Sequence, residues 1–195
     1  MADERLGRMY TSLSAVQKCI RRGMDEEAVY YAFYLVKDGF MTTLLNRLVV
    51  VAYEDVGTGS MVSSLYALEA VKQTKEWYPK GPWVLSLVNA VLALSRASKS
   101  RDSDNLQIVI AHDLANNPFR EPPDFCFDEH TLKGKKMGRS TDFFYETAAA
   151  LADDVSTPDW RNRAWKTDLE LDRTKQDVHG QFAGEKKPVG LSDFK

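Results

Sequence analysis

The chain has 195 residues, with 26 lysine and arginine side chains against 28 aspartates and glutamates, so its formal net charge is -2. This balance excludes the strongly basic surface of many nucleic-acid binders and leaves room only for a local basic patch. Two distant cysteines, Cys19 and Cys126, make no disulfide framework, which indicates a reducing, cytoplasmic environment. No apolar run is long enough to span a membrane, and the polar start predicts no signal peptide.

The first half of the chain shows helical periodicity with clear boundaries. Asp25 is placed to cap a helix that runs to Val36, and Gly39 follows where a left-handed residue ends a helix. Apolar residues at i, i+3, i+4 and i+7 predict the next helix over 41–54. We interpret its β-branched run, 48–51, as helix rather than strand.

Three more helices are predicted before residue 116. Ser60 caps the first, which ends at the proline- and glycine-containing stretch 78–82. Pro82 suits the first turn of the second, which continues to Leu94. Ser103 or Asp104 opens the third, which continues to Leu114.

The second half is less regular. After a proline-rich connector over 116–128, we expect short helices at 130–137 and 141–152, the second capped by Ser140. A charged helix then begins at Thr157-Pro158 and ends near Gln176. The prediction is an all-α protein: a compact multi-helix domain of about eight or nine helices over 1–178, with a flexible tail over 179–195.

Motifs for catalysis are mostly missing. The segment 133–138 lacks the first glycine and the hydroxyl residue of a phosphate-binding loop, and no nucleophile elbow or paired-cysteine zinc spacing occurs. We therefore expect no enzyme activity, cofactor or metal. One alternative stays open: His112-Asp113, with later ligands from 128–130, could form the metal site of an HD-like phosphohydrolase.

Two local basic clusters are candidate DNA-binding sites. Glycines within the later one allow close approach of the backbone to a phosphate. That cluster comprises Lys133, Lys135, Lys136 and Arg139, and the other comprises Arg96, Lys99 and Arg101. Lys18, Arg21 and Arg22 form a third, weaker group. The alternative is that these charged side chains only form a solvated helix face.

Aromatic side chains are concentrated around the helix that follows Asp25. They exceed what one core-facing stripe needs, and aromatic enrichment is typical of association interfaces. The candidate interface consists of Tyr30, Tyr31, Phe33, Tyr34 and Phe40. Packing within the monomer core is the alternative.

Three segments, 17–23, 25–31 and 47–57, resemble the C-terminal helical region of the replication-associated recombination ATPases, the RarA or MgsA group with the Werner-helicase-interacting protein as eukaryotic relative. The most specific piece is Glu54-Asp55-Val56-Gly57 in its helical context. Weaker similarity occurs at 67–71 and 91–100. The resemblance covers about 11–115, and the ATPase core that precedes this region in the family has no counterpart here.

The resemblance implies an all-helical oligomerisation module that builds tetramers and acts at replication forks. We expect Glu54 and Asp55 to be structural, with their carboxylates accepting hydrogen bonds from backbone N–H groups of the following loop or helix start. The leading hypothesis is a non-enzymatic replication and recombination protein that self-associates and contacts DNA or replisome proteins. The alternative is a protein-interaction module without nucleic acid, suggested by the likeness of 190–194 to clamp-docking peptides.

Overall fold

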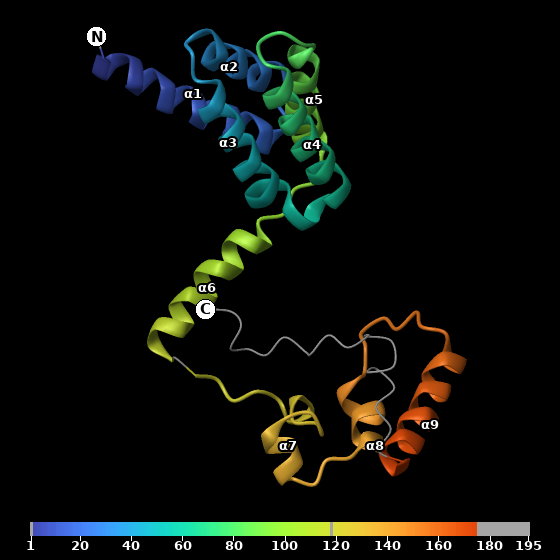
Figure 1. The fold of residues 1–195 in the computed structure, drawn as a ribbon. Helices are drawn as coiled ribbons and strands as arrows, with labels where there is room; N and C mark the ends of the chain where they lie inside the picture. The colour runs from blue at the N-terminus through green and yellow to red at the C-terminus, as the bar shows by residue number, and fades with distance from the viewer. Residues whose placement is uncertain (1, 118, 175–195) are drawn as a thin grey trace, which may run out of the picture. The chain divides into compact units, whose positions relative to one another are not determined.

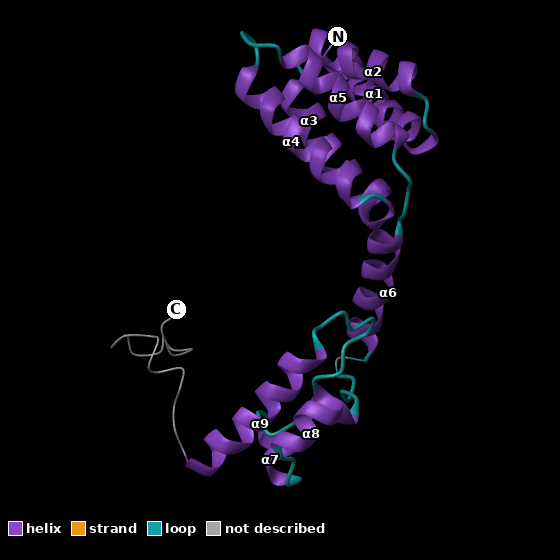
Figure 2. Ribbon diagram, turned by 90° about the vertical axis from the view of Figure 1, so that its right-hand side faces the viewer, coloured by secondary structure: helices purple, strands orange, loops and turns teal. Residues whose placement is uncertain are grey.

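The computed structural model describes residues 2–117 and 119–174, and the regular elements within them are all helices (Figures 1 and 2). The all-α prediction is confirmed. The expected tail over 179–195 and the clamp-like segment 190–194 lie outside the described residues. The α-helices are α1 (Ala2–Arg22), α2 (Asp25–Lys37), α3 (Met41–Val51), α4 (Met61–Trp77), α5 (Trp83–Arg96), α6 (Asp102–Asn116), α7 (Leu132–Lys136), α8 (Thr141–Phe143) and α9 (Pro158–Thr174).

Four short segments have other helical geometries. Two are π-helical, η1 (Ala52–Val56) after α3 and η4 (Phe144–Ala148) after α8, and two are 3-10 turns, η2 (Gly57–Gly59) and η3 (Asp124–Cys126). None of the described helices is long and apolar enough to cross a bilayer.

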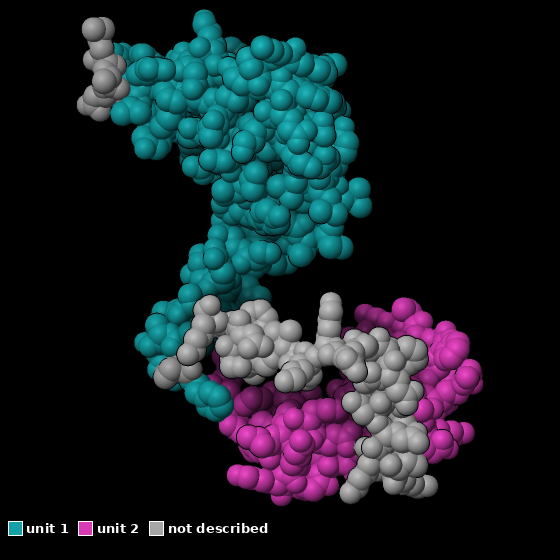
Figure 3. All heavy atoms as spheres, viewed as in Figure 1, with its two compact units in different colours: residues 1–119 teal, residues 120–195 magenta. Residues whose placement is uncertain are grey.

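The internal contacts divide the chain into two compact units, residues 1–119 and 120–195 (Figure 3). Each unit is described by itself below. The expectation of one folding domain over 1–178 stays a prediction, because grouping by contacts does not measure whether the units unfold together.

Several helix boundaries follow the sequence signals. The run 48–51 is helical, as predicted, and Gly39 has φ +84°, the left-handed conformation expected after α2. The Ser60 side chain accepts a hydrogen bond from the backbone N–H of Ser63 and so caps α4. Pro82 is the residue directly before α5.

Other boundaries differ from the predictions. Asp25 is the first residue of α2 rather than its cap; Met24 precedes the helix without a side-chain hydrogen bond. The expected helix over 141–152 is only α8 continued by η4, and Ser140 precedes it without a capping hydrogen bond. The longest helix, α1, has no counterpart among the predicted elements.

The core of the first unit is one apolar cluster. Helices α1, α2, α3 and α5 each contribute large side chains with less than 2% exposure: Ile20, Leu35, Leu44, Leu48, Leu87 and Leu94. Full burial of such a side chain contributes about 1.5–3 kcal/mol. Smaller residues of α4, including Ala67 and Ala70, let that helix pack closely on α5.

A hydrogen bond between hydroxyls supports the α4–α5 contact. Thr74 is fully buried on α4, and its Oγ1 lies 2.8 Å from Oγ of Ser86 on α5. One hydroxyl donates to the other, and the second donates to a carbonyl oxygen of its own helix, either Ala70 or Trp83, so both buried hydroxyls are satisfied.

Candidate functional site

A buried carboxylate lies at the centre of the first unit's polar contacts. Asp55 lies in η1 with no exposed side-chain surface. Its carboxylate accepts hydrogen bonds from Gln17 Nε2 at 2.9 Å, Arg21 Nε at 2.7 Å and Arg101 Nη1 at 2.8 Å. Because these donors belong to α1 and to the residue before α6, Asp55 connects three segments that are distant in sequence.

The neighbouring carboxylate shares the same arginines. Glu54 Oε1 accepts from Arg101 Nη1 at 2.8 Å and from Arg21 Nη2 at 3.3 Å. Arg47 donates to Gln17 Oε1 at 2.9 Å, which orients the amide so that its nitrogen faces Asp55. We call Gln17, Arg21, Arg47, Glu54, Asp55 and Arg101 the carboxylate network.

The backbone around the network is equally specific. The Ser100 N–H donates to the Asp55 carbonyl at 3.1 Å, which brings the loop before α6 against η1. A Cβ at Gly59 would lie 2.7 Å from the Lys99 backbone carbonyl carbon, so only glycine fits this approach. Ser64 donates to the Ala52 carbonyl at 3.0 Å and satisfies a group at the start of the π-helix.

Two opposing effects set the pKa of Asp55. Burial by itself raises the pKa of Asp55, but hydrogen bonds from Arg21, Gln17 and Arg101 together hold that pKa below its ordinary value. Asp55 is therefore ionised at neutral pH, and three side-chain donors bind its two carboxylate oxygens. This arrangement connects η1 to α1 and to the residue before α6.

The network confirms part of the expectation for Glu54 and Asp55. They are structural, but their carboxylates bind arginine and glutamine side chains rather than backbone N–H groups. The signal in the sequence is the arginines of the flanking segments, of which Arg21 and Arg101 also belong to the candidate DNA-binding groups.

The first basic cluster is engaged by this protein's own groups. Arg101 joins the network and also pairs with Asp104. Arg96 Nε lies 2.7 Å from Asp25 Oδ2. Lys99 Nζ donates to the carbonyls of Ser95 and Ala97, and burial lowers its pKa against the attraction of Asp55 and Asp25. Its role in DNA binding remains a prediction, and these contacts compete with phosphate.

The second basic cluster is only partly engaged. Lys133 pairs with Glu121 and lies 3.9 Å from the Phe127 ring centroid. Arg139 donates to both carboxylate oxygens of Asp124 at 2.7 Å and lies over Phe143. Lys135 and Lys136 are exposed on α7. Of this cluster, these two side chains are the ones most accessible to a phosphate.

The aromatic candidates separate into two groups. Tyr31 and Phe40 pack against the apolar core, as the core alternative expected. Tyr30 and Phe33 are exposed by 64% and 40%. Tyr34 lines a surface hollow of about 490 Å³ between α1 and α2, together with Tyr30 and Tyr31. The interface assignment stays a prediction. Of its five residues, Tyr30, Phe33 and Tyr34 are the ones that do not pack against the core.

Sequence reasoning missed the exposed apolar side chains of α6, α4 and α5. α6 has no buried residue, and Leu106, Ile108, Val109 and Leu114 are each exposed by more than half. On α4, Met61, Val62, Leu65 and Tyr66 are exposed, and Leu85 of α5 is too. Tyr66, Trp77 and Leu85 line a hollow of about 370 Å³ between these two helices.

The residues of the metal alternative are divided between the two units. His112 is exposed on α6, and its ring contacts the Asn116 amide of the same helix. His130 Nδ1 lies 3.3 Å from Asp128 Oδ2 in the second unit. Within the described residues, no three His, Cys, Asp or Glu side chains are grouped as a metal site requires.

Comparison with known proteins identifies the family. Residues 23–165 match the family model described as the MgsA AAA+ ATPase C terminal. Replication-associated recombination protein A of Bacillus subtilis (strain 168) is 30% identical over 136 residues, which cover 70% of this chain and 32% of that protein. The chain thus matches about a third of this relative's length. The family match begins later than the resemblance over 11–115 and extends into the second unit. This chain belongs to the MgsA AAA+ ATPase C-terminal family.

Proposed function

We propose that this chain is a self-associating helical module of a replication- and recombination-associated protein, and that it acts by assembly and contact rather than by catalysis. The observation that carries the proposal is the exposed apolar surface of α6. Four of its large apolar side chains are uncovered, although an isolated helix of about 15 residues is only marginally stable in water.

Family membership supports the biological setting. The B. subtilis relative is named for replication-associated recombination, and the match lies in the family's C-terminal region. The carboxylate network supports a scaffold role, because its two carboxylates are bound by arginines of the same protein. A second copy of this chain is the occupant that we propose for α6, with a tetramer as the expected assembly.

Helical geometry provides a matched test. Leu106 and Leu114 lie within about 80° of each other around α6, whereas Ile108 lies on the opposite side, at about 100° per residue. Ile108 is exposed by 61% and Leu106 by 60%. Analytical ultracentrifugation should show oligomers of the wild type at tens of micromolar. The double variant Leu106→Gln/Leu114→Gln should shift them toward monomer, and Ile108→Gln should not.

A strictly monomeric wild type at this concentration would overturn the proposal. Equal loss of oligomer in the Leu106→Gln/Leu114→Gln and Ile108→Gln variants would show that α6 does not associate through the proposed face. Unchanged far-UV circular dichroism controls for folding, since the substituted side chains are already exposed.

Contact with DNA is a second part of the proposal, and exposed Lys135 and Lys136 favour it. Phosphate contacts of this kind release counterions, so affinity for duplex DNA should fall steeply between low and physiological salt. Lys135→Gln/Lys136→Gln should reduce both the affinity and the salt slope. Salt-independent affinity, or none at either salt concentration, would count against it.

A further inference from the structure

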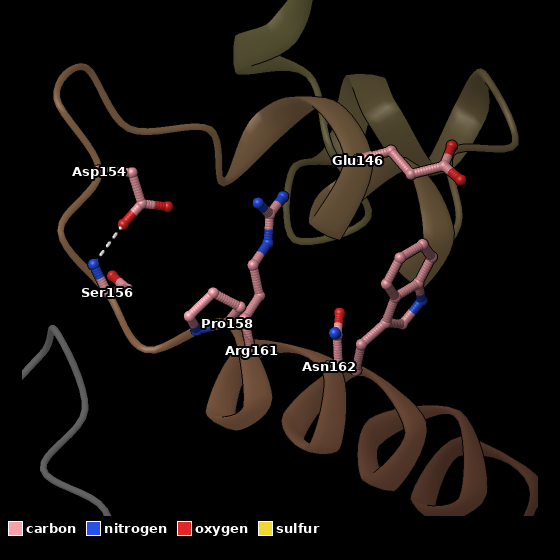
Figure 4. Close-up of a pocket in the computed structure, with 7 residues that line it drawn as sticks. Glu146, Asp154, Ser156, Pro158, Arg161 and Asn162 are labelled. Atoms are coloured by element: carbon pink, nitrogen blue, oxygen red, sulfur yellow. Dashed lines mark hydrogen bonds between the residues drawn. The ribbon is translucent and has the colours of Figure 1, made fainter.

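The second unit contains a hollow that the proposed function does not use. Its volume is about 460 Å³, within the size range of small-ligand sites. Pro158, Arg161, Asn162 and Trp165 line it from the first two turns of α9. The opposite side is formed by Glu146 of η4 and by the loop that contains Asp154 and Ser156. Figure 4 shows Arg161 and Asn162 pointing from α9 into this space.

Contacts behind the lining hold it in place. The Trp165 indole stacks on Tyr145, with ring centroids 5.7 Å apart and an interplanar angle of 11°, and its Nε1 donates to Asp142 Oδ1 at 2.9 Å. Arg161 donates to the Tyr145 carbonyl. Tyr145 itself is buried, so the aromatic wall is anchored to a buried side chain and the guanidinium to the backbone of the same residue.

Charge in the hollow argues against a phosphate ligand. One guanidinium, on Arg161, is outnumbered by the carboxylates of Glu146 and Asp154. Asp154 accepts from the Ser156 N–H at 2.8 Å, and hydrogen bonds from Ser156 lower the pKa of Asp154, so it is ionised at neutral pH (Figure 4). A strongly anionic group would be repelled by this lining.

The chemistry of the lining suits a neutral, planar ligand with both donors and acceptors. Trp165 and Pro158 supply apolar walls, carboxylates accept, and Arg161 donates. The Asn162 amide both donates and accepts, and it has no hydrogen-bond partner among the described residues. Asparagine is the side chain that pairs with adenine edges through two hydrogen bonds, and indoles stack on bases of any sequence.

We propose that this hollow binds one unpaired base of a single-stranded nucleic acid, stacked at Trp165 and hydrogen-bonded at its edge by Asn162. The inference deepens the proposed contact with DNA and is independent of self-association through α6. The sugar-phosphate backbone would stay outside, because the carboxylates repel it. Binding would therefore depend on the base more than on the charge.

The test compares two single strands of equal charge. A fluorescent deoxyadenylate decamer and an abasic decamer with the same number of phosphates are titrated with the full chain at about 50 and 200 mM salt. Base stacking predicts that the deoxyadenylate strand binds about 5- to 150-fold more tightly. This ratio should persist at the higher salt, whereas backbone contacts weaken steeply.

Substitutions test whether the hollow causes the difference in affinity between the two strands. Asn162→Ala removes an exposed side chain without loss of packing, and it should lower the affinity for deoxyadenylate several-fold and leave the abasic strand unchanged. Trp165→Leu should abolish most of the preference. Trp160→Leu is the matched control, because Trp160 lies on the same helix, is 64% exposed and does not line the hollow.

Three results would overturn the inference: equal affinity for the two strands, no binding of deoxyadenylate at millimolar protein, or equal effects of Trp160→Leu and Trp165→Leu. If instead Lys135 and Lys136 do not contact DNA, the affinities of both strands should not depend on salt. The ratio of these two affinities should be unchanged. Loss of oligomers in analytical ultracentrifugation should change neither the ratio of the two affinities nor their salt dependence.

Discussion

The two units are held together by different physical means. Residues 1–119 contain a continuous apolar core to which α1, α2, α3 and α5 each contribute fully buried side chains. Among the described residues of the second unit, Tyr145 is the one buried hydrophobic side chain. Ring stacking, cation–π contacts and ion pairs connect the rest, including the stack of Tyr145 with Trp165 and the pair of Arg139 with Asp124.

This difference predicts different stabilities. The stabilisation from apolar burial scales with the buried area and changes little with salt or pH. Partly exposed ion pairs contribute about 0–1 kcal/mol each, and salt screens them. We therefore expect the second unit to open first as denaturant or salt is added. Hydrogen exchange read peptide by peptide separates the two units and provides the measurement for the substitutions below.

The largest effect is expected in the apolar core. Leu48→Ala removes a fully buried side chain of α3 and should lower the free energy of unfolding of the first unit by about 2–5 kcal/mol. Exchange protection in the second unit should not change. Leu106→Ala is the control, because that side chain is exposed and its loss should cost under about 0.5 kcal/mol in the monomer. Equal loss of protection in both units would mean that they unfold together.

The next largest effect is expected in the carboxylate network. Asp55→Ala removes the buried one of the two carboxylates that Arg21 and Arg101 share, and breaking a fully buried ion pair costs about 3–5 kcal/mol. Both arginine side chains are 35% exposed, so water compensates in part, and we expect about 2–3 kcal/mol. A denaturant titration that follows the first unit measures this loss in the free energy of unfolding.

Glu54→Ala is the matched control for that substitution. Its carboxylate binds the same two arginines but is 26% exposed, and we expect its loss to cost under about 1 kcal/mol. If the two alanine variants were equally destabilised, burial of Asp55 would not be the cause.

The contrast between the units also explains what the sequence could predict. Helical periodicity placed α2 to α5 closely, because their apolar stripes are the same residues that form the core, as at Leu44 and Leu48. Among the described hydrophobic residues of the second unit only Tyr145 is buried, so the pattern over 141–152 does not correspond to a buried helix face, and the structure has only α8 and η4 there.

Side-chain partners were predicted less well than helices. A sequence shows that Arg101 is cationic, but not that Glu54 and Asp55 lie beside it, because that contact depends on η1 and on the close approach at Gly59. Likewise, nothing in the periodicity of α6 indicates that its apolar residues are exposed in the described structure. Local signals therefore predicted elements, whereas the network and the exposed faces required the tertiary structure.

A smaller effect is expected for the aromatic centre of the second unit. The Tyr145 hydroxyl donates to Asp168, and burial, with this hydrogen bond, raises the pKa of Tyr145 to about 12. Because Asp168 is partly exposed, Tyr145→Phe should cost about 1–2 kcal/mol, near the low end for bonds to charged acceptors. Faster exchange should be confined to the second unit. Tyr10→Phe, at a 66% exposed position of α1, should change neither unit.

The smallest effect is the acid dependence of the first unit. The pKa of Asp55 is lower in the folded protein than the value of about 3.9 for an unfolded aspartate, so its contribution is complete above about pH 4 and is lost as pH falls through the folded value. From this group alone the free energy of unfolding should decrease by at most about 1.4 kcal/mol per pH unit. Asp55→Asn cannot titrate, and its stability should be flatter than that of the wild type between about pH 4 and 2. Parallel curves for the two proteins would show that Asp55 has an ordinary pKa and that the arginines do not hold it ionised.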